Sequence, residues 1–217
     1  MEKASRIPLI RMLRGKMLRI AELQDAVIVE LSKRVDFVLR GGTAVWRVYG
    51  GKRFSYDIDL YCPQPESIPE VLSRSFNPPR SMITGSGYLY LRVSDGETVE
   101  VEAARPLKEV DAVEAEYWLV DGTKLVVKAL SPCALLEEKV SAYIDRRKAR
   151  DLYDAYYMLD FCEDAERLRR AAQSLLAALT ELPEDYSLLD ELILAGRAPS
   201  FRTIVEKVRR VASQKVR

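Results

Sequence analysis

The spacing of the apolar residues changes from strand-like to helical at Ser131–Pro132. Before this point, short runs alternate between apolar and polar residues, which is typical of strands, and turn residues separate them. After it, apolar residues recur at helical spacing. The pattern predicts an α+β fold, with a mixed sheet and flanking helices in residues 1–130 and a helical bundle in residues 131–217. The strand-like runs are residues 36–40, 56–62, 88–93, 98–103, 116–120 and 124–130.

Local signals predict several element boundaries. Ser131 is a typical N-cap residue, and Pro132 suits the first position of the helix that follows. Apolar residues at a period of about 3.6 predict an N-terminal helix across residues 10–31. The other expectations are helical turns after Gly42, a short helix near 68–74, a hairpin turn at Asp121–Gly122 and helix breaks near Pro183 and Pro199.

Composition and targeting signals favour a cytoplasmic protein. No run approaches the roughly 18 apolar residues of a membrane span, and basic residues interrupt any apolar segment near the N-terminus. The three cysteines, Cys62, Cys133 and Cys162, are scattered and lack C-x-x-C spacing, which favours a reducing compartment and argues against structural zinc. A low content of Asn and Gln beside abundant Arg, Glu and Lys leans toward a thermophilic source.

The chain contains no histidine. Its chemistry therefore cannot use an imidazole base or a histidine-ligated metal, which leaves carboxylates, Lys, Arg, Ser and Tyr as candidates. The net charge is only +1, but residues 1–20 carry +5, residues 197–217 carry +6, and the middle of the chain is acidic. Basic ends could bind a polyanion, or they could simply be solvated helix faces, and the sequence leaves both readings open.

The run YDIDLYC, residues 56–62, places two aspartates on one face of a strand. Because side chains alternate along a strand, Asp57 and Asp59 share a face, while Ile58 and Leu60 point to the other. Two residues of rise separate the carboxylates by roughly 7 Å, close enough to converge on a divalent metal site. Taken alone, the pair could equally be a solvated strand face.

A glycine pair precedes this run and suggests a phosphate site. Gly41-Gly42 follows a strand and lets the backbone approach a phosphate closely, and a helix starting at Thr43 would direct N–H groups at the anion. Arg53 and Ser55 add further donors. A glycine pair alone is usually just a turn. Its combination with the two aspartates is much more specific.

These residues resemble the DNA polymerase β-like nucleotidyltransferase superfamily, and within it the AbiEii/AbiGii group, the toxins of type IV toxin–antitoxin pairs. A second block, residues 135–159, resembles the K-x-x-A…R-x-x-x-R-D-x-x-D signature of that group. The resemblance covers roughly residues 36–160 and implies the polymerase β-like mixed sheet followed by helices. The residues of this sequence that match the signature are Lys139, Ala142, Arg146, Arg150, Asp151 and Asp154.

On helical spacing alone, Lys139, Arg146 and Arg150 form one polar stripe, and Asp151 and Asp154 border the apolar face of the next helix. Surface ion pairing would explain this pattern equally well. The resemblance instead implies that Lys139 and Asp151 belong to an active site and that Arg146 and Arg150 contact the substrate.

The resemblance implies a two-metal nucleotidyl transfer with Mg²⁺ or Mn²⁺. Asp57 and Asp59 would hold the metal, together with a third carboxylate from residues 97–103. We favour Glu102 over Glu100, although each glutamate could also lie on a solvated strand face. The residues that would neutralise the phosphates are Gly41, Gly42, Thr43, Arg53, Ser55 and Lys139.

The expected reaction moves a nucleoside monophosphate from a nucleoside triphosphate to an acceptor. RNA, such as a tRNA end, is the acceptor that the basic termini would suit, and an antitoxin protein is a possible partner. Two alternatives stay open: a nucleotide- or RNA-binding module without turnover, and a metal-dependent phosphohydrolase. No membrane partner is expected.

Overall fold

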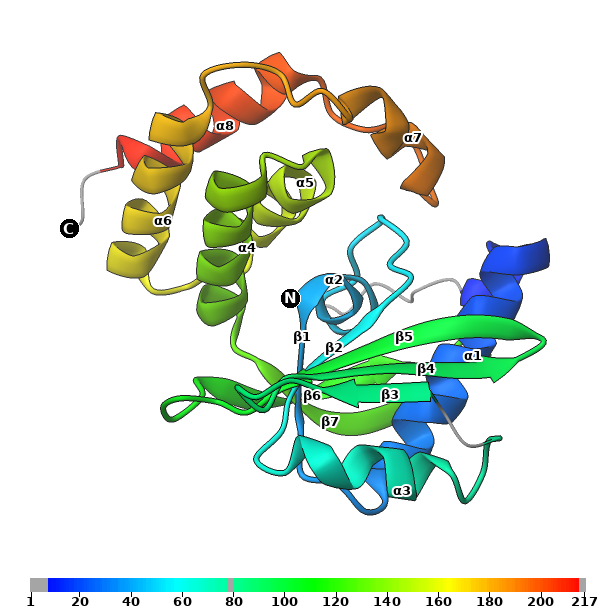
Figure 1. Cartoon of the computed structure of the whole chain (residues 1–217). Coiled ribbons are helices and arrows are strands. Elements are labelled where there is room, and N and C mark those ends of the chain that lie inside the picture. Colours follow the sequence, from blue (N-terminus) through cyan, green and yellow to red (C-terminus); the bar gives the residue numbers. More distant parts are fainter. Residues whose placement is uncertain (1–7, 78–79, 215–217) are drawn as a thin grey trace. The chain divides into compact units, whose positions relative to one another are not determined.

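The computed structural model describes residues 8–77 and 80–214, and the chain divides into two compact units (Figure 1). The first unit comprises residues 1–49 and 55–129, and the second comprises residues 50–54 and 130–217. The short segment 50–54 therefore belongs with the helical part of the chain, whereas the sequence alone assigns it to the first domain. Four basic residues counted in the charged termini, Lys3, Arg6, Lys215 and Arg217, lie outside the described residues.

The first unit contains a seven-stranded mixed sheet in the order β3-β4-β5-β2-β1-β7-β6. Strand β1 is antiparallel to β2 and parallel to β7, and β2 is parallel to β5, so the mixed sheet predicted from the sequence is confirmed. The strands are β1 (Val38–Arg40), β2 (Ile58–Tyr61), β3 (Arg80–Ile83), β4 (Leu89–Asp95), β5 (Glu97–Ala104), β6 (Ala112–Trp118) and β7 (Lys124–Leu130).

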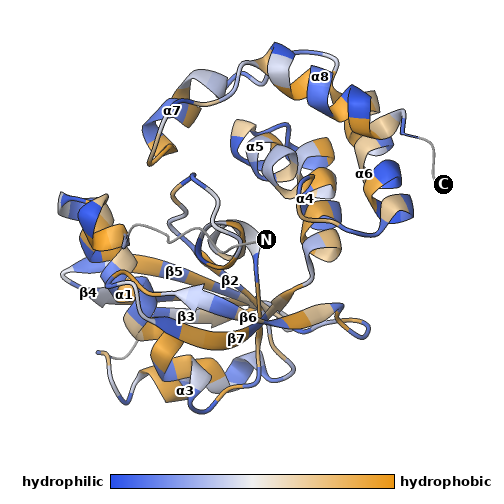
Figure 2. Ribbon diagram, turned by 180° about the vertical axis from the view of Figure 1, so that it is seen from behind, coloured by the Kyte–Doolittle hydropathy of each residue, from blue (hydrophilic) through white to orange (hydrophobic). Residues whose placement is uncertain are grey.

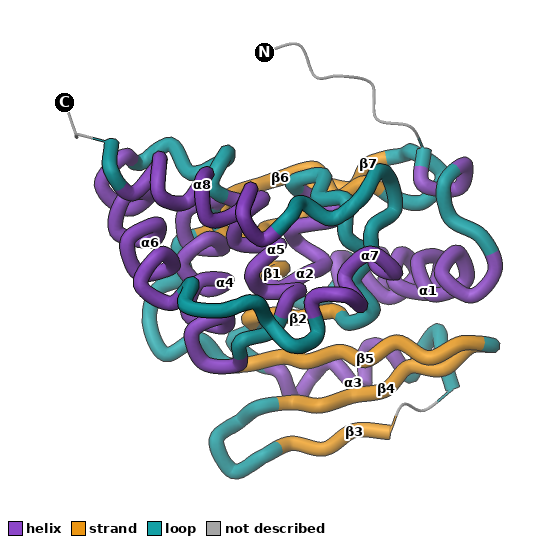
Figure 3. Tube along the Cα trace, turned by 90° about the horizontal axis from the view of Figure 1, so that it is seen from above, coloured by secondary structure: helices purple, strands orange, loops and turns teal. Residues whose placement is uncertain are grey.

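Strand β3 forms one edge of this sheet, beside β4 (Figure 3). The sequence does not predict it, because all four of its residues are exposed and no apolar alternation marks the run. Its antiparallel pairing with β4 holds it in place, with Met82 opposite Tyr90 and Arg80 opposite Arg92. Backbone pairing, not burial, therefore determines this strand.

One face of the sheet forms the core of the first unit. Ile58 and Leu60 on β2 and Val99 and Val101 on β5 are fully buried on this face. Helix α1 (Gly15–Ser32) packs against β5 and α3 (Ile68–Leu72), and α3 lies below the sheet in Figure 1. The alternate residues, including Asp59 and Glu102, are less buried and point to the opposite face.

Between β1 and β2 the chain forms a short helical segment. Helix α2 (Gly41–Thr43) leads directly into a π-helical turn (Ala44–Val48). Helical turns after the glycine pair were expected from Thr43 onward. The structure begins them at Gly41, so the glycine pair lies within the helix and not before it.

The second unit is helical, as predicted. Ser131 caps α4 by accepting a hydrogen bond from the Ala134 N–H at 3.2 Å, and Pro132 is the first helical residue. Segment 50–54 pairs with the end of α7 and the loop after it, since the Phe54 N–H donates to the Leu192 carbonyl and the Leu194 N–H donates to the Lys52 carbonyl, both at 2.8 Å. The helices of four or more residues are α4 (Pro132–Arg146), α5 (Ala149–Met158), α6 (Ala165–Ala178), α7 (Leu189–Leu192) and α8 (Phe201–Ala212).

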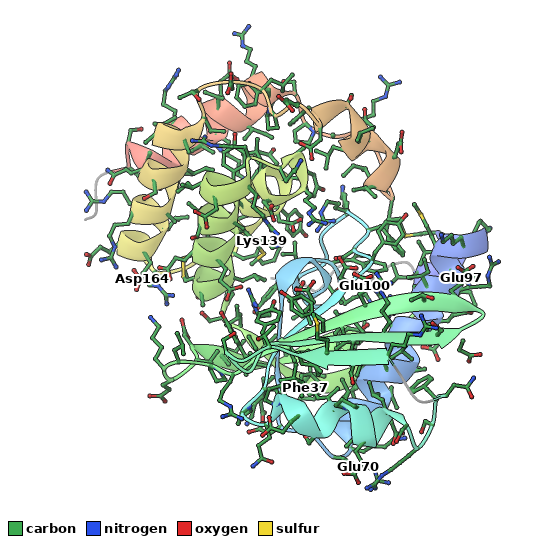
Figure 4. The ribbon with its side chains drawn as sticks, viewed as in Figure 1. Phe37, Glu70, Glu97, Glu100, Lys139 and Asp164 are labelled. Atoms are coloured by element: carbon green, nitrogen blue, oxygen red, sulfur yellow. A yellow bond between two sulfur atoms is a disulfide. The ribbon has the colours of Figure 1, made fainter. Side chains whose placement is uncertain are left out.

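The C-terminal helix α8 is strongly amphipathic. Ile204, Val208 and Val211 are buried, and polar residues alternate with these apolar ones around the helix (Figure 2). Asp164, labelled in Figure 4, caps α6 by accepting from the backbone N–H groups of Glu166 and Arg167. Within the described part of the chain, no helix is both long enough and apolar enough to cross a membrane.

A disulfide joins Cys133 at the start of α4 to Cys162 after α5, across a sequence separation of 29 residues. The scattered cysteines favour a reducing compartment, and the sequence does not predict this pairing, because cysteine spacing along the sequence does not reveal which thiols meet in the fold. Cys62 is free and buried. The disulfide therefore constrains the first two helices of the second unit, α4 and α5.

Reduction of this disulfide is expected to destabilise the protein. A cross-link closing a loop of this length restricts the unfolded chain and contributes about 3–4 kcal/mol in the chain-entropy model. Thermal unfolding of the wild type with and without dithiothreitol should show a marked fall in melting temperature on reduction. Cys133→Ser is the matched control, since it should show the lower value in both conditions. A reductant-insensitive wild type would contradict the prediction.

Candidate active site

Two carboxylates lie side by side on the open face of the sheet. Asp59 on β2 is the parallel register partner of Glu102 on β5, so their side chains point to the same face. Both are half-buried. Glu100, labelled in Figure 4, lies two residues before Glu102 on β5 and pairs instead with Arg92 at 2.8 Å. The geometry therefore brings Glu102, and not Glu100, next to Asp59.

Gly41 makes room for the Asp59 carboxylate. Its φ of +69° lies in the left-handed region that favours glycine, and a Cβ built on it would lie 1.9 Å from Asp59 Oδ2. Any other residue would displace this carboxylate. The sequence suggested that Gly41 allows a phosphate to approach, whereas in the structure the space is taken by Asp59.

Two buried side chains hold the segment that leads into β2. The Thr43 hydroxyl donates to the backbone carbonyl of Asp57, and Thr43 is fully buried. The Gln24 amide donates to the carbonyls of Ser55 and Tyr56 at 2.9 Å each. Thr43 was predicted to contact substrate, and its hydroxyl is instead used to position Asp57. Gln24 was not predicted, although a polar residue on the apolar stripe of α1 is a signal for it.

Tyr88 orients the second carboxylate. Its hydroxyl donates to Glu102 Oε2 at 2.9 Å. Burial raises the pKa of Tyr88, and the hydrogen bond to Glu102 raises it further, so the phenol stays protonated and keeps donating at neutral pH. Sequence reasoning missed this residue, because Tyr88 reads only as part of an alternating strand.

Arg40 lies on the other side of Asp59. It is the antiparallel register partner of Asp59 on β1, and its guanidinium lies over the Tyr61 ring, 4.5 Å from the ring centre. The Asp59 carboxylate therefore stands in a cross-strand row between a cation and a second carboxylate. Arg40 directly precedes Gly41-Gly42, and this position is the sequence signal that could have identified it.

In the second unit, the predicted cations are part of a buried ionic network. Arg53 donates to both oxygens of Asp154 at 2.8 Å each and to the Phe54 carbonyl at 2.8 Å. Lys139 Nζ lies 2.8 Å from Asp154 Oδ2 and 3.8 Å from Asp151 Oδ1. Figure 4 labels Lys139 on α4. Arg53, predicted to contact phosphate, uses these donors within the protein.

The remaining members of the second block differ in exposure. Asp151 is buried and accepts from Arg146 at 2.8 and 2.9 Å, whereas the Arg146 side chain is half exposed. Arg150 is exposed. The sequence suggested a polar stripe with both aspartates bordering an apolar helix face. Asp151 and Asp154 are fully buried, so their ion pairs are not the surface pairs that the sequence left open as the alternative.

Asp59 and Glu102 are suitable ligands for a magnesium ion. Among the described residues, no three carboxylates or thiols are gathered closely enough to hold a metal by themselves. Mg²⁺, however, is usually bound through one or two carboxylates, with substrate phosphates and water completing its shell. The adjacent pair meets that requirement. Because Gly41 has no Cβ, the Asp59 carboxylate can occupy its position beside Glu102. The carboxylate of Asp57, just before β2, stays a predicted third ligand.

Comparison with known proteins identifies a matching family and similar folds. The family model described as nucleotidyl transferase AbiEii toxin, type IV TA system, matches residues 23–211. The crystal structure of JHP933 from Helicobacter pylori is similar with a TM-score of 0.68 and 20% identity, covering 92% of this chain and 93% of that one. The antibiotic-resistance factor ANT(2'')-Ia has a TM-score of 0.50 and 16% identity, over 76% and 96%. No curated protein sequence matches.

Proposed function

Because the chain belongs to the family of AbiEii nucleotidyltransferase toxins, we propose that it transfers a nucleoside monophosphate from a nucleoside triphosphate to the end of an RNA. The observation that carries the proposal is the adjacent pair Asp59–Glu102 on the open sheet face. Carboxylates placed in this way suit a metal-dependent attack of a hydroxyl on a triphosphate, which releases pyrophosphate.

We assign the metal-binding role to Asp57, Asp59 and Glu102, with Mg²⁺ or Mn²⁺ as the ion. When bound, the ion would neutralise phosphate charge and favour deprotonation of the attacking hydroxyl. Glu102, oriented by Tyr88, accepts the proton of that hydroxyl. At the same time the oxygen of the hydroxyl forms a bond to the α-phosphorus. The bond from the α-phosphorus to the departing oxygen breaks, and pyrophosphate leaves.

The basic residues have separate proposed roles. Lys139, Arg146 and Arg150 remain candidates for neutralising phosphate charge, together with the backbone of Gly42 and the hydroxyl of Ser55. Arg53 acts through Asp154 as a positioning residue, because its donors to Asp154 and the Phe54 carbonyl are already used within the fold. Asp151 orients Arg146 in the same way, by accepting hydrogen bonds from its guanidinium at 2.8 and 2.9 Å.

We further propose an antitoxin protein as partner and a cytoplasmic location, where RNA acceptors are abundant. The disulfide Cys133–Cys162 is unusual for that compartment. Intracellular proteins of hyperthermophiles are the known exception, because they are often rich in disulfides. A thermophilic source, which the amino-acid composition favours, would reconcile the two observations.

The reaction can be tested directly with labelled substrates. The protein is incubated with Mg²⁺, total cellular RNA and one α-labelled nucleoside triphosphate at a time. The expected result is label in RNA and release of pyrophosphate. Orthophosphate release without a labelled acceptor would identify a phosphohydrolase, and stabilisation by nucleotide without any product would identify a binding module. Label on the protein itself would contradict the proposal that RNA is the acceptor.

A further inference from the structure

A row of side chains crosses the sheet from the carboxylate pair to the edge strand. Register pairs Asp59 with Glu102, Glu102 with Tyr90 and Tyr90 with Met82, on strands β2, β5, β4 and β3. Directly opposed residues on neighbouring strands point to the same face. Tyr90 and Met82 therefore extend, strand by strand, the face that carries the proposed catalytic groups.

The outer end of this row is unusually apolar for a surface. Met82 is 61% exposed and Tyr90 is 42% exposed. The Tyr90 ring lies 4.8 Å from the ring of Tyr88, centre to centre, and Tyr88 donates to Glu102. The two tyrosine rings thus lead from the Glu102 carboxylate to β4, and Met82 extends the row onto the edge strand β3.

Two arginines form a second row beside the first. Arg80 and Arg92 are register partners on β3 and β4, and Arg92 is opposite Glu100 on β5. Glu100 orients the Arg92 guanidinium through a hydrogen bond at 2.8 Å. The hollow between the rows has a volume of about 360 Å³ and is lined by residues of both rows, including Met82, Tyr90, Arg80 and Glu102.

We propose that this hollow and its two rows, the β3–β4 face, bind the single-stranded end of the RNA acceptor. The proposal rests on the function proposed above and names the site of its second substrate. Exposed aromatic and thioether side chains offer a stacking surface for bases, and arginines beside them suit the phosphates between those bases.

The position of the hollow favours a nucleic acid end over a protein partner. A single-stranded end lying along Met82 and Tyr90 would bring its terminal ribose hydroxyl to Glu102, the group assigned to accept the proton. An apolar protein surface would account for Met82 and Tyr90, but it would leave the Arg80–Arg92 pair facing apolar groups at a desolvation cost.

The test measures RNA binding and transfer separately. Binding of a fluorescent single-stranded oligoribonucleotide is measured by anisotropy without triphosphate, and KM values for RNA and triphosphate are measured in the transfer reaction. Tyr90→Ala should weaken RNA binding about tenfold or more and raise the KM for RNA similarly. The KM for triphosphate should not change. Tyr90→Phe should restore binding, because it keeps the stacking ring.

Two further variants complete the test. Arg80→Ser should reduce the salt dependence of RNA binding, because a phosphate contact is lost. Val126→Ala, an exposed apolar residue on β7, is the matched control and should bind RNA like the wild type. Unchanged RNA binding in Tyr90→Ala and Met82→Ala would overturn the proposal. A raised KM for triphosphate alone in these variants would also overturn it, because it would assign the hollow to the nucleotide. A wild type that binds the oligoribonucleotide here but never transfers label would refute the proposed function instead.

Discussion

Asp59→Asn is expected to reduce nucleotidyl transfer by about a thousandfold, which corresponds to about 4 kcal/mol of lost transition-state stabilisation. The substitution keeps the shape of the side chain that fills the space beside Gly41, so the local packing is unchanged. It removes the negative charge that would hold the divalent ion. The loss should appear in the turnover rate measured with labelled triphosphate.

The fold of this variant should be intact. Asp59 and Glu102 are adjacent carboxylates that repel each other, so removing one charge relieves repulsion in the metal-free protein. The melting temperature without metal should therefore stay level or rise slightly. The rise that Mg²⁺ and a triphosphate cause in the wild type should be absent from the variant.

Matched variants distinguish the site from the rest of the surface. Asp36→Asn removes an exposed carboxylate that pairs with Lys128 at 2.9 Å, and it should leave transfer unchanged. Glu102→Gln should lower the turnover rate as much as Asp59→Asn, whereas Glu100→Gln should raise the KM for RNA, because Glu100 orients Arg92, and leave the turnover rate at saturating RNA nearly unchanged. Unimpaired transfer by Asp59→Asn would remove this aspartate from the catalytic site, and equal losses in Glu100→Gln and Glu102→Gln would contradict the choice of Glu102.

Local patterns in the sequence predict which face of the sheet carries the acidic side chains. The alternation of YDIDLYC and ETVEVEA predicts which face carries the acids, since strand geometry allows only two faces. The register that places Glu102 beside Asp59 is a property of two strands far apart in the chain, and alternation leaves Glu100 equally eligible. The sequence therefore predicts the face but only favours one glutamate over the other.

Contacts between segments that are distant in the sequence could not be predicted from local patterns. Arg53 and Asp154 are 101 residues apart, and nothing in their local spacing indicates that they pair. The same holds for Cys133 and Cys162, and for Tyr88 and Glu102. Strand β3 was not predicted for a different reason: its side chains are all exposed, so its sequence shows no alternation of apolar and polar residues. In each case the determining interaction is tertiary.

The most consequential of these distant contacts gives the second large prediction. Asp154→Asn is expected to lower the free energy of unfolding by about 3–5 kcal/mol, because it removes one partner of a buried ionic network. Asp154 is completely buried and accepts hydrogen bonds from both Arg53 and Lys139. An amide cannot neutralise two buried cations, and Asp151 lies 3.8 Å from Lys139, too far to replace it.

The pH dependence of this loss has a defined sign. Burial raises the pKa of Asp154, but Arg53 and Lys139 together outweigh burial, so its pKa lies below the ordinary value of 3.8. A carboxylate with a lowered pKa in the folded state stabilises the protein above that ordinary value, and its contribution is lost as the pH falls further. The difference in stability between wild type and Asp154→Asn should thus be full at neutral pH and shrink below about pH 4.

Thermal and denaturant unfolding of the two proteins between pH 3 and pH 7 measures this difference. Glu206→Gln is the control within the same unit, since Glu206 pairs with Arg202 on the exposed surface of α8 and should affect stability little. A network that serves only substrate binding would leave unfolding of Asp154→Asn like that of the wild type at every pH. A large loss at neutral pH that shrinks in acid would instead assign Arg53 and Asp154 to holding segment 50–54 against α5.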